Sequence, residues 1–259
     1  MRAALDRYLA NALRNEWDAG CLVTRVLNEA VDFDVLNEAF GSLKQAVRTV
    51  ADPQSLCEFV AGEGFVGDSS TYYALDNSRL DHLLTQRRGI PITLGVLYVE
   101  LGRAAGLSMR GIGFPGHFLV GADDALIDPF TNCVIATDAW RAWLREHDLL
   151  AHAGVELTRA APDDIALRML NNAKRVLFGR SDNSAVATAL DVVDCQLALG
   201  GDAVALHLER AELWRRLGSI AGVRAALTDA RDATTDPSVR AAMDARIASI
   251  PRLPTPTSH

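Results

Sequence analysis

The chain has 259 residues and a formal net charge of −7, and 49% of its residues are apolar while 23% are charged. This composition is typical of a globular protein and excludes an intrinsically disordered one. The net negative charge, with no basic run longer than two residues, argues against nucleic acid as a partner. The longest apolar stretch, around residues 90–100, is too short to span a bilayer, so no membrane partner is expected.

The cysteines give the first indication of the compartment. Four are scattered along the chain, at Cys21, Cys57, Cys133 and Cys195, with no CxxC pair and no histidine at metal-ligand spacing. We therefore expect reduced, mostly buried thiols in a cytoplasmic protein, and no metal site. The N-terminal residues lack the apolar region of a signal peptide. No glycine-rich phosphate loop follows a predicted strand, so no cofactor is expected.

The first hundred residues are predicted to be mainly helical, because apolar residues recur there at helical spacing up to about residue 106. Asp52-Pro53 marks one helix start. Asn77 is placed to cap a further helix, which Gly89 ends. Pro91 then opens the next helix.

From Leu107 the pattern changes to short runs rich in β-branched and aromatic residues, bounded by turn residues. These runs are residues 109–114, 117–120, 125–128 and 133–135. They predict a small antiparallel sheet that follows a helix. After Pro162 no strand signal remains and Ala-rich helical segments follow, so the predicted fold class is α+β with an all-α region at the C-terminal side.

The change of pattern predicts a core domain at residues 1–160, a helical domain at 161–250 and a disordered Pro/Thr-rich tail at 251–259. The 34 residues from Val204 to Pro237 have the length of a tetratricopeptide repeat. Small, aromatic, glycine, large and small residues fall at the positions that this repeat prefers, namely Ala211, Trp214, Gly218, Leu227 and Ala230. An ordinary helical bundle is the alternative, since alanine-rich helix pairs produce such spacings by chance.

The segment GFPGHFLVGADDALIDPF, residues 113–130, holds the most informative side chains. If a hairpin closes at Ala122-Asp123, His117 faces Asp128 with Cβ atoms about 4.5 to 5.5 Å apart. A three-residue loop would shift the register by one and place the two on opposite faces. An imidazole oriented by a carboxylate is the acid–base half of a nucleophilic triad, whereas the alternative is a structural hydrogen bond beside the Pro115-Gly116 turn.

A nucleophile is usually held at a helix N-terminus, where free N–H groups stabilise a thiolate. The helix that begins at RRGIPIT has no cysteine there, and Thr93 is the only nucleophile-capable side chain in its first turn. Packing or capping is the alternative role for this threonine. Arg87 and Arg88 could draw an acidic partner toward that terminus, with Gly116 as a further binding residue, although a solvated arginine pair is the alternative.

The runs RRGIPITLGVLYVELGRAAGL, GIGFPGHFLV and LIDPF resemble the bacterial SirB-type proteins, which carry a transglutaminase-like core domain. The run ALRMLNNAKRVLF, ahead of repeat-like helices, extends this resemblance to about residues 70–235. The wider superfamily implies a Cys–His–Asp triad, with the cysteine at the head of a central helix. His117 and Asp128 match two of its places, but the cysteine place, near Ile90 to Ile92, is empty. Cys57 or Cys133 would have to approach His117 to replace it.

Two functions are therefore open. The first is a non-catalytic or weakly catalytic transglutaminase-like module that binds a protein or peptide partner, or has a regulatory role. The second is a hydrolase or acyl-transfer enzyme acting on peptide amides. It would use His117 as general base, Asp128 to orient it, and Thr93 or an activated water as nucleophile. A metal site on His117 and Asp128 is disfavoured, because two ligands are too few.

Overall fold

The computed structural model describes residues 1–251. The chain divides into two compact units, residues 1–173 and residues from 174 onward. The division lies within helix α8, later in the chain than the boundary predicted near residue 160. The α+β class is confirmed. Residues 252–259 of the predicted tail lie outside the described residues. Within residues 1–251, no helix is long and apolar enough to cross a membrane.

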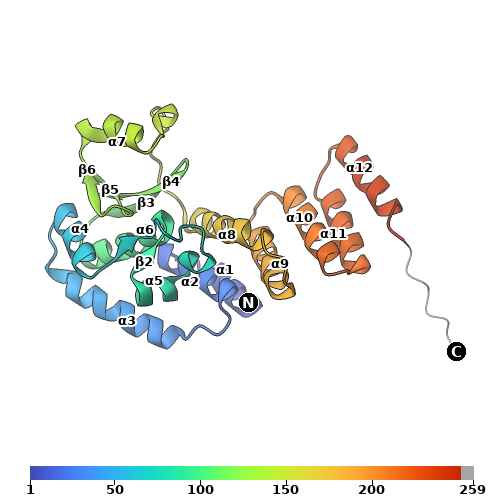
Figure 1. Ribbon diagram of the computed structural model, residues 1–259, viewed down its shortest axis with the longest axis horizontal. Coiled ribbons are helices and arrows are strands. Elements are labelled where there is room, and N and C mark those ends of the chain that lie inside the picture. The colour runs from blue at the N-terminus through green and yellow to red at the C-terminus, as the bar shows by residue number, and fades with distance from the viewer. Residues whose placement is uncertain (252–259) are drawn as a thin grey trace. The chain divides into compact units, whose positions relative to one another are not determined.

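The first unit combines helices with two small sheets (Figure 1). Its helices are α1 (Arg2–Ala10), α2 (Glu16–Leu27), α3 (Phe33–Ala46), α4 (Pro53–Gly62), α5 (Leu80–Gln86), α6 (Pro91–Ala104), α7 (Trp140–Glu146) and α8 (Pro162–Phe178), the last of which continues into the second unit. Its strands are β1 (Val66–Gly67), β2 (Arg88–Gly89), β3 (Met109–Phe114), β4 (His117–Ala122), β5 (Ala125–Asp128) and β6 (Cys133–Ile135). Short 3-10 turns lie at Val47–Thr49, Leu75–Ser78, Thr137–Ala139 and Leu150–His152.

The predicted helix starts are confirmed except at Asn77. Asp52 caps α4 through the backbone N–H of Ser55, and Pro91 is the first residue of α6. Asn77 caps no helix: its amide donates to Asp68 Oδ2 at 3.1 Å and to the carbonyl of Thr71 at 2.7 Å. Its Oδ1, the atom that a cap would use, accepts no hydrogen bond from a described residue, and α5 begins later, at Leu80. The Asn77 amide holds the loop together instead.

The larger sheet is antiparallel in the order β3-β4-β5-β6, while β1 and β2 form a separate parallel pair. The β4–β5 register pairs Ala122 with Ala125, so the turn is at Asp123-Asp124 and not at Ala122-Asp123 as predicted. Asp123 takes a positive φ of 47°, which aspartate tolerates better than most residues. The predicted direct opposition of His117 and Asp128 is therefore wrong by two residues. Because side chains alternate with period two, both still lie on one face.

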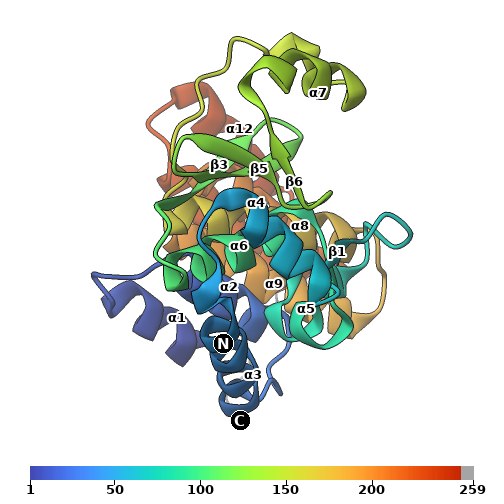
Figure 2. The same cartoon turned by 90° about the vertical axis from the view of Figure 1, so that its left-hand side faces the viewer.

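The sheet lies between α6 and α7 (Figure 2). Helix α6 is buried from Pro91 through Gly102. Glycine is required where the sheet comes closest, because a Cβ on Gly95 would lie 2.5 Å from the ring of Phe118. The opposite face packs under α7 in an apolar cluster that includes Ile112, Phe114, Leu119, Trp143 and Leu144.

The second unit is helical and includes α9 (Asn183–Ala198), α10 (Ala203–Arg216), α11 (Ile220–Asp232) and α12 (Pro237–Ala248). A buried cluster of Ala211, Ala226, Leu227, Ala230 and Met243 joins α10, α11 and α12. Gly218 ends the first helix of this group with a φ of 72°. These small residues allow the helices to pack closely.

Candidate functional site

The side chains of His117 and Asp128 meet on the α7 side of the sheet. His117 is the first residue of β4 and Asp128 the last of β5, and His117 Nε2 lies 2.9 Å from Asp128 Oδ1. The His117 side chain is 9% exposed and that of Asp128 is fully buried. Since a carboxylate can only accept, Nε2 carries the proton in the neutral ring and Nδ1 holds the lone pair. This is the arrangement that a general base requires.

Asp128 also accepts hydrogen bonds from its own chain. The backbone N–H of Phe130 donates to Oδ1 at 2.9 Å, and the Thr131 hydroxyl donates to Oδ2 at 2.9 Å. Burial raises the pKa of the Asp128 carboxyl, but the hydrogen bond and charge of His117 and these two donors outweigh it. The net pKa is lowered. The carboxylate therefore stays ionised while fully buried.

Two further side chains cover the pair, Trp143 of α7 and His147, which directly follows that helix. Trp143 Nε1 donates to Asp128 Oδ2 at 3.3 Å, and His147 Nε2 lies 3.6 Å from the same oxygen. The Trp143 ring packs edge-on against His117, with ring centroids 5.2 Å apart. These contacts hold the imidazole in place and leave little of it in contact with solvent.

Arg168 of α8 binds the backbone of the turn before His117. Its Nη2 donates to the carbonyls of Phe114 and His117, at 2.8 and 2.9 Å. Gly116 lies in this turn with a φ of 70°, after Pro115. The structure thus gives Gly116 a conformational role, and its predicted role in substrate binding stays a prediction.

Thr93 lies in the first turn of α6, next to the segment Ile90 to Ile92 where the superfamily's cysteine is expected. It is fully buried, and its hydroxyl donates to the backbone carbonyl of Asn77 at 2.7 Å. No hydrogen bond joins it to His117 within the described residues. The structure therefore brings together two of the predicted catalytic side chains, His117 and Asp128, and gives the third a bond to the main chain.

The two predicted binding arginines follow α5 but lie in different surroundings. Arg87 ends that helix in the left-handed conformation, with a φ of 56°. Its guanidinium lies 4.3 Å from the ring centroid of Phe65. Arg88 is exposed in β2 and pairs with Val66 of β1. Of the two, Arg88 is the one available to a partner.

Cys133, the exposed thiol of β6, is the cross-strand neighbour of Asp128 and so shares a face with His117. Its thiol donates to the carbonyl of Thr131 at 3.4 Å. Cys57 is buried in α4, and burial raises the pKa of its thiol to about 11. No hydrogen bond joins either sulfur to His117 in the part of the chain that the structure describes.

Exposed side chains of β1, β2 and the loop between them belong to segments that are connected to Asp128 through Phe130. Tyr73 is 72% exposed and packs against Tyr72, whose ring centroid lies 6.0 Å from that of Phe130. Phe130 in turn binds Asp128 through its backbone N–H. We name Val66, Tyr73 and Arg88 the Tyr73 surface.

Sequence reasoning missed Trp143, His147 and Arg168 as parts of this site. The tryptophan of α7 and the histidine that caps its C-terminal end are four residues apart, a spacing that places them on one side of the helix. That spacing was the available signal. It does not say which part of the sheet the face covers.

The chain is similar in sequence to several known proteins. A family profile described as the transglutaminase-like superfamily matches residues 33–171. A UPF0162 protein of Vibrio cholerae is 35% identical over 89 residues, which are 32% of this chain and 33% of that protein. A UPF0162 protein of Pseudomonas aeruginosa is 26% identical over 233 residues, covering 87% of this chain and 83% of that one.

The match extends to a eukaryotic protein of another kind. The F-box only protein 21 of Mus musculus is 28% identical over 163 residues, which are 60% of this chain but only 26% of that protein. No solved structure matches the chain. The family profile covers more than half of the sequence, on the same residues that carry the sheet, α6 and the His117–Asp128 pair. The chain belongs to the transglutaminase-like superfamily.

Proposed function

We propose that this chain is a transglutaminase-like domain that binds a protein or peptide partner and carries out no cysteine-dependent acyl transfer. The observation that carries the proposal is the state of Thr93. The hydroxyl at the head of α6 is buried and donates to the carbonyl of Asn77. A group without solvent access, with its proton in a main-chain bond, is a poor nucleophile.

Burial of the acid–base pair supports the same function. Trp143 and His147 pack over His117, and Asp128 is satisfied by donors from three directions. A substrate carbonyl needs open space beside the base, within about 3 Å. The pair instead anchors α7 to the sheet.

The Tyr73 surface supports a binding role. Tyrosine and arginine are the residues most often found at the energetic centre of protein interfaces. Here an exposed tyrosine and an exposed arginine belong to segments that are connected to Asp128 through Phe130. We propose that this surface contacts the partner.

We also propose that the chain is of the SirB type and that its second unit is tetratricopeptide-like. Similarity to the UPF0162 proteins over both units favours the first assignment. The second is favoured by Ala211, Leu227 and Ala230, which lie at small and large positions of the repeat pattern and are all buried. Paired helices of this kind offer a further surface for a peptide.

A peptide-display experiment tests the binding function. Peptides selected from a displayed random library on the full chain are measured against the variants Tyr73→Ser and Arg88→Glu, with Val35→Ser as the control. Val35 is exposed to a similar degree on α3. We expect each Tyr73-surface variant to weaken the selected peptides about tenfold or more, and the control to leave them unchanged. Equal binding by all three would contradict the assignment of this surface.

A weakly catalytic function is the second candidate, and Cys133 favours it. This exposed thiol shares the sheet face of His117 and Asp128. It would attack a peptide amide with His117 as base and Asp128 orienting the ring. Turnover of a glutamine peptide with a primary amine, lost in both Cys133→Ser and His117→Ala, would establish this candidate in place of the first.

A further inference from the structure

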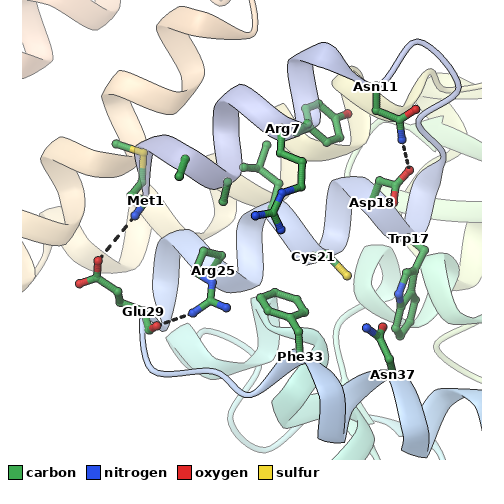
Figure 3. A pocket seen from close by; sticks show the side chains of 14 residues that line it. Met1, Arg7, Asn11, Trp17, Asp18, Cys21, Arg25, Glu29, Phe33 and Asn37 are labelled. Carbon is green, nitrogen blue, oxygen red and sulfur yellow. Dashed lines mark hydrogen bonds and ion pairs between the residues drawn. The ribbon is translucent and has the colours of Figure 1, made fainter.

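A cavity lies away from the His117–Asp128 pair. It is a pocket of about 540 Å³ between α1, α2 and α3 (Figure 3). Pockets that hold small organic ligands have volumes of about 300 to 1,000 Å³. Helices α1 and α2 precede residues 33–171, the segment that matches the superfamily, so this pocket is largely built outside the matched domain.

The apolar walls of the pocket are aromatic and held in place. The Trp17 ring of α2 stacks on Phe40, with centroids 3.6 Å apart and planes at 9°. Phe33 of α3 forms another wall, and Tyr8 lines the α1 side. Tyr8 is fixed by its hydroxyl, which donates to Asp163 at 2.8 Å. Fixed aromatic walls bind a flat or aliphatic body at low entropic cost.

Two guanidinium groups point into the same space (Figure 3). Arg25 of α2 lies over the Phe33 ring, 4.6 Å from its centroid, and its Nη1 donates to the carbonyl of Glu29. Arg7 of α1 has no hydrogen bond or ion pair with any described residue. Arg7 thus lines the pocket with its donors unused.

The carboxylates of the lining are already engaged at the ends of the pocket (Figure 3). Asp18 accepts from the backbone N–H of Asn15 at 3.0 Å and from the amide of Asn11 at 3.1 Å. Glu29 lies 3.6 Å from the amino group of Met1 and is 88% exposed. The centre of the pocket therefore carries the positive charge of the two arginines without a facing carboxylate.

We propose that this pocket binds a small organic anion, a carboxylate attached to an aromatic or aliphatic body, with the carboxylate between Arg7 and Arg25 and the body against Trp17 and Phe33. Arginine suits this role because its planar fork matches a carboxylate. Cys21 also lines the pocket, and burial raises the pKa of its thiol to about 12. The thiol is therefore protonated at neutral pH and serves as a weakly polar wall.

Titration calorimetry on the full chain tests the site with matched probes. The anions are 2-naphthoate and decanoate, and the neutral controls are 2-naphthamide and decanamide. We expect at least one acid to bind about tenfold or more tightly than its amide, because a charge-assisted hydrogen bond to arginine is lost in the amide. The better of the two acids identifies the aromatic or the aliphatic body. Acid and amide binding equally, or no acid binding at millimolar concentration, would overturn the proposal.

Variants on the same helix make the test specific. Arg7→Gln should weaken the acid about tenfold, while Arg2→Gln, a helix α1 arginine that does not line the pocket, should not. Arg7 makes no contact that the fold needs, so Arg7→Gln should melt with the wild type. Ala4→Phe, which fills the pocket, should abolish binding. Wild-type affinity in Arg7→Gln would place the anion elsewhere.

Thiol protection gives a second measurement. In a Cys133→Ser protein, the exposed thiol is gone, Cys57 and Cys195 are buried, and Cys21 is the partly accessible one. The tighter-binding acid should slow alkylation of Cys21 in proportion to occupancy, as followed by peptide mass spectrometry. Unchanged alkylation at saturating acid would show that the ligand binds outside this pocket.

Discussion

The head of α6 and the adjoining ends of β4 and β5 are the two places where a transglutaminase-like active site needs reactive groups, and they are built in opposite ways. At the helix, the Thr93 hydroxyl is consumed by a main-chain bond to Asn77. At the strands, His117 and Asp128 keep the geometry of an acid–base pair, with Nδ1 of the imidazole unused by Asp128. The Thr93 hydroxyl therefore bonds the main chain, whereas His117 and Asp128 bond each other.

The hydrogen bonds of the His117–Asp128 pair give it a structural role that does not depend on a nucleophile. Asp128 accepts from the Phe130 N–H, Thr131 and Trp143 as well as from His117, so it joins β5, the following loop and α7. Removing such an acceptor would leave the buried indole N–H of Trp143 and the largely covered imidazole of His117 without their partner. The pair therefore contributes to the stability of the fold.

The largest effect on stability is expected from Asp128→Ala. The change leaves the donors of His117, Thr131 and Trp143 without their acceptor, and we expect a loss of about 3 to 5 kcal/mol in the free energy of unfolding. Urea denaturation followed by circular dichroism measures it. A loss under about 1 kcal/mol would show that the pair is not structural and would return it to a catalytic role.

At the head of α6, Thr93→Val should lower the free energy of unfolding by about 1 to 3 kcal/mol, because the carbonyl of Asn77 loses its donor. Thr93→Ser keeps the hydroxyl and loses only a methyl group, so the two variants separate the hydrogen bond from packing. Unfolding of Thr93→Val at the wild-type urea concentration would mean that the hydroxyl is free for chemistry.

Acid should selectively weaken the interaction between His117 and Asp128. The pKa of Asp128 is lowered in the folded chain, since its ionised form gains the hydrogen bonds and charge of His117 against the opposing effect of burial. The stability that this adds is fully present above the unfolded pKa of about 4 and is lost as the pH falls toward the lower folded pKa. The stability difference between wild type and Asp128→Asn should therefore shrink below about pH 4, as measured by urea titrations from pH 7 to pH 3. A constant difference would contradict the lowered pKa.

The smallest effect on stability is expected at the Tyr73 surface. Tyr73 is 72% exposed, so Tyr73→Ser should change the free energy of unfolding by no more than about 0.5 kcal/mol. The same variant should lose the selected peptides. A large loss of stability would mean that the side chain belongs to the fold, and its effect on binding would then say nothing about a partner surface.

The sequence predicted the association of His117 with Asp128 although it misplaced the turn. Face assignment depends only on the parity of the spacing, so an error of two residues left both side chains on the same side. The position of the turn depends on Asp123 adopting a positive φ. The sequence alone does not show which residue of the turn adopts it. Helix boundaries at Asp52 and Pro91 were predicted because capping and proline effects are local.

The rest of the site depends on contacts between distant segments. The partner of Thr93 is a carbonyl 16 residues earlier in the chain, and Arg168 lies 51 residues from the carbonyl of His117 that it binds. Nothing in the local pattern around Trp143 says which strands α7 covers. Such contacts arise from tertiary packing, which periodicity and turn residues do not encode.

Intact-mass spectrometry tests whether His117 activates a nucleophile, with the full chain incubated with a glutamine peptide and with a reactive acyl ester of the same peptide. If the domain only binds its partner, no acyl adduct depends on His117, so wild type and His117→Ala should give the same spectrum and release no product. An acyl adduct on Cys133 or Thr93 in the wild type, absent from His117→Ala, would show that the pair activates a nucleophile and would contradict the proposed function.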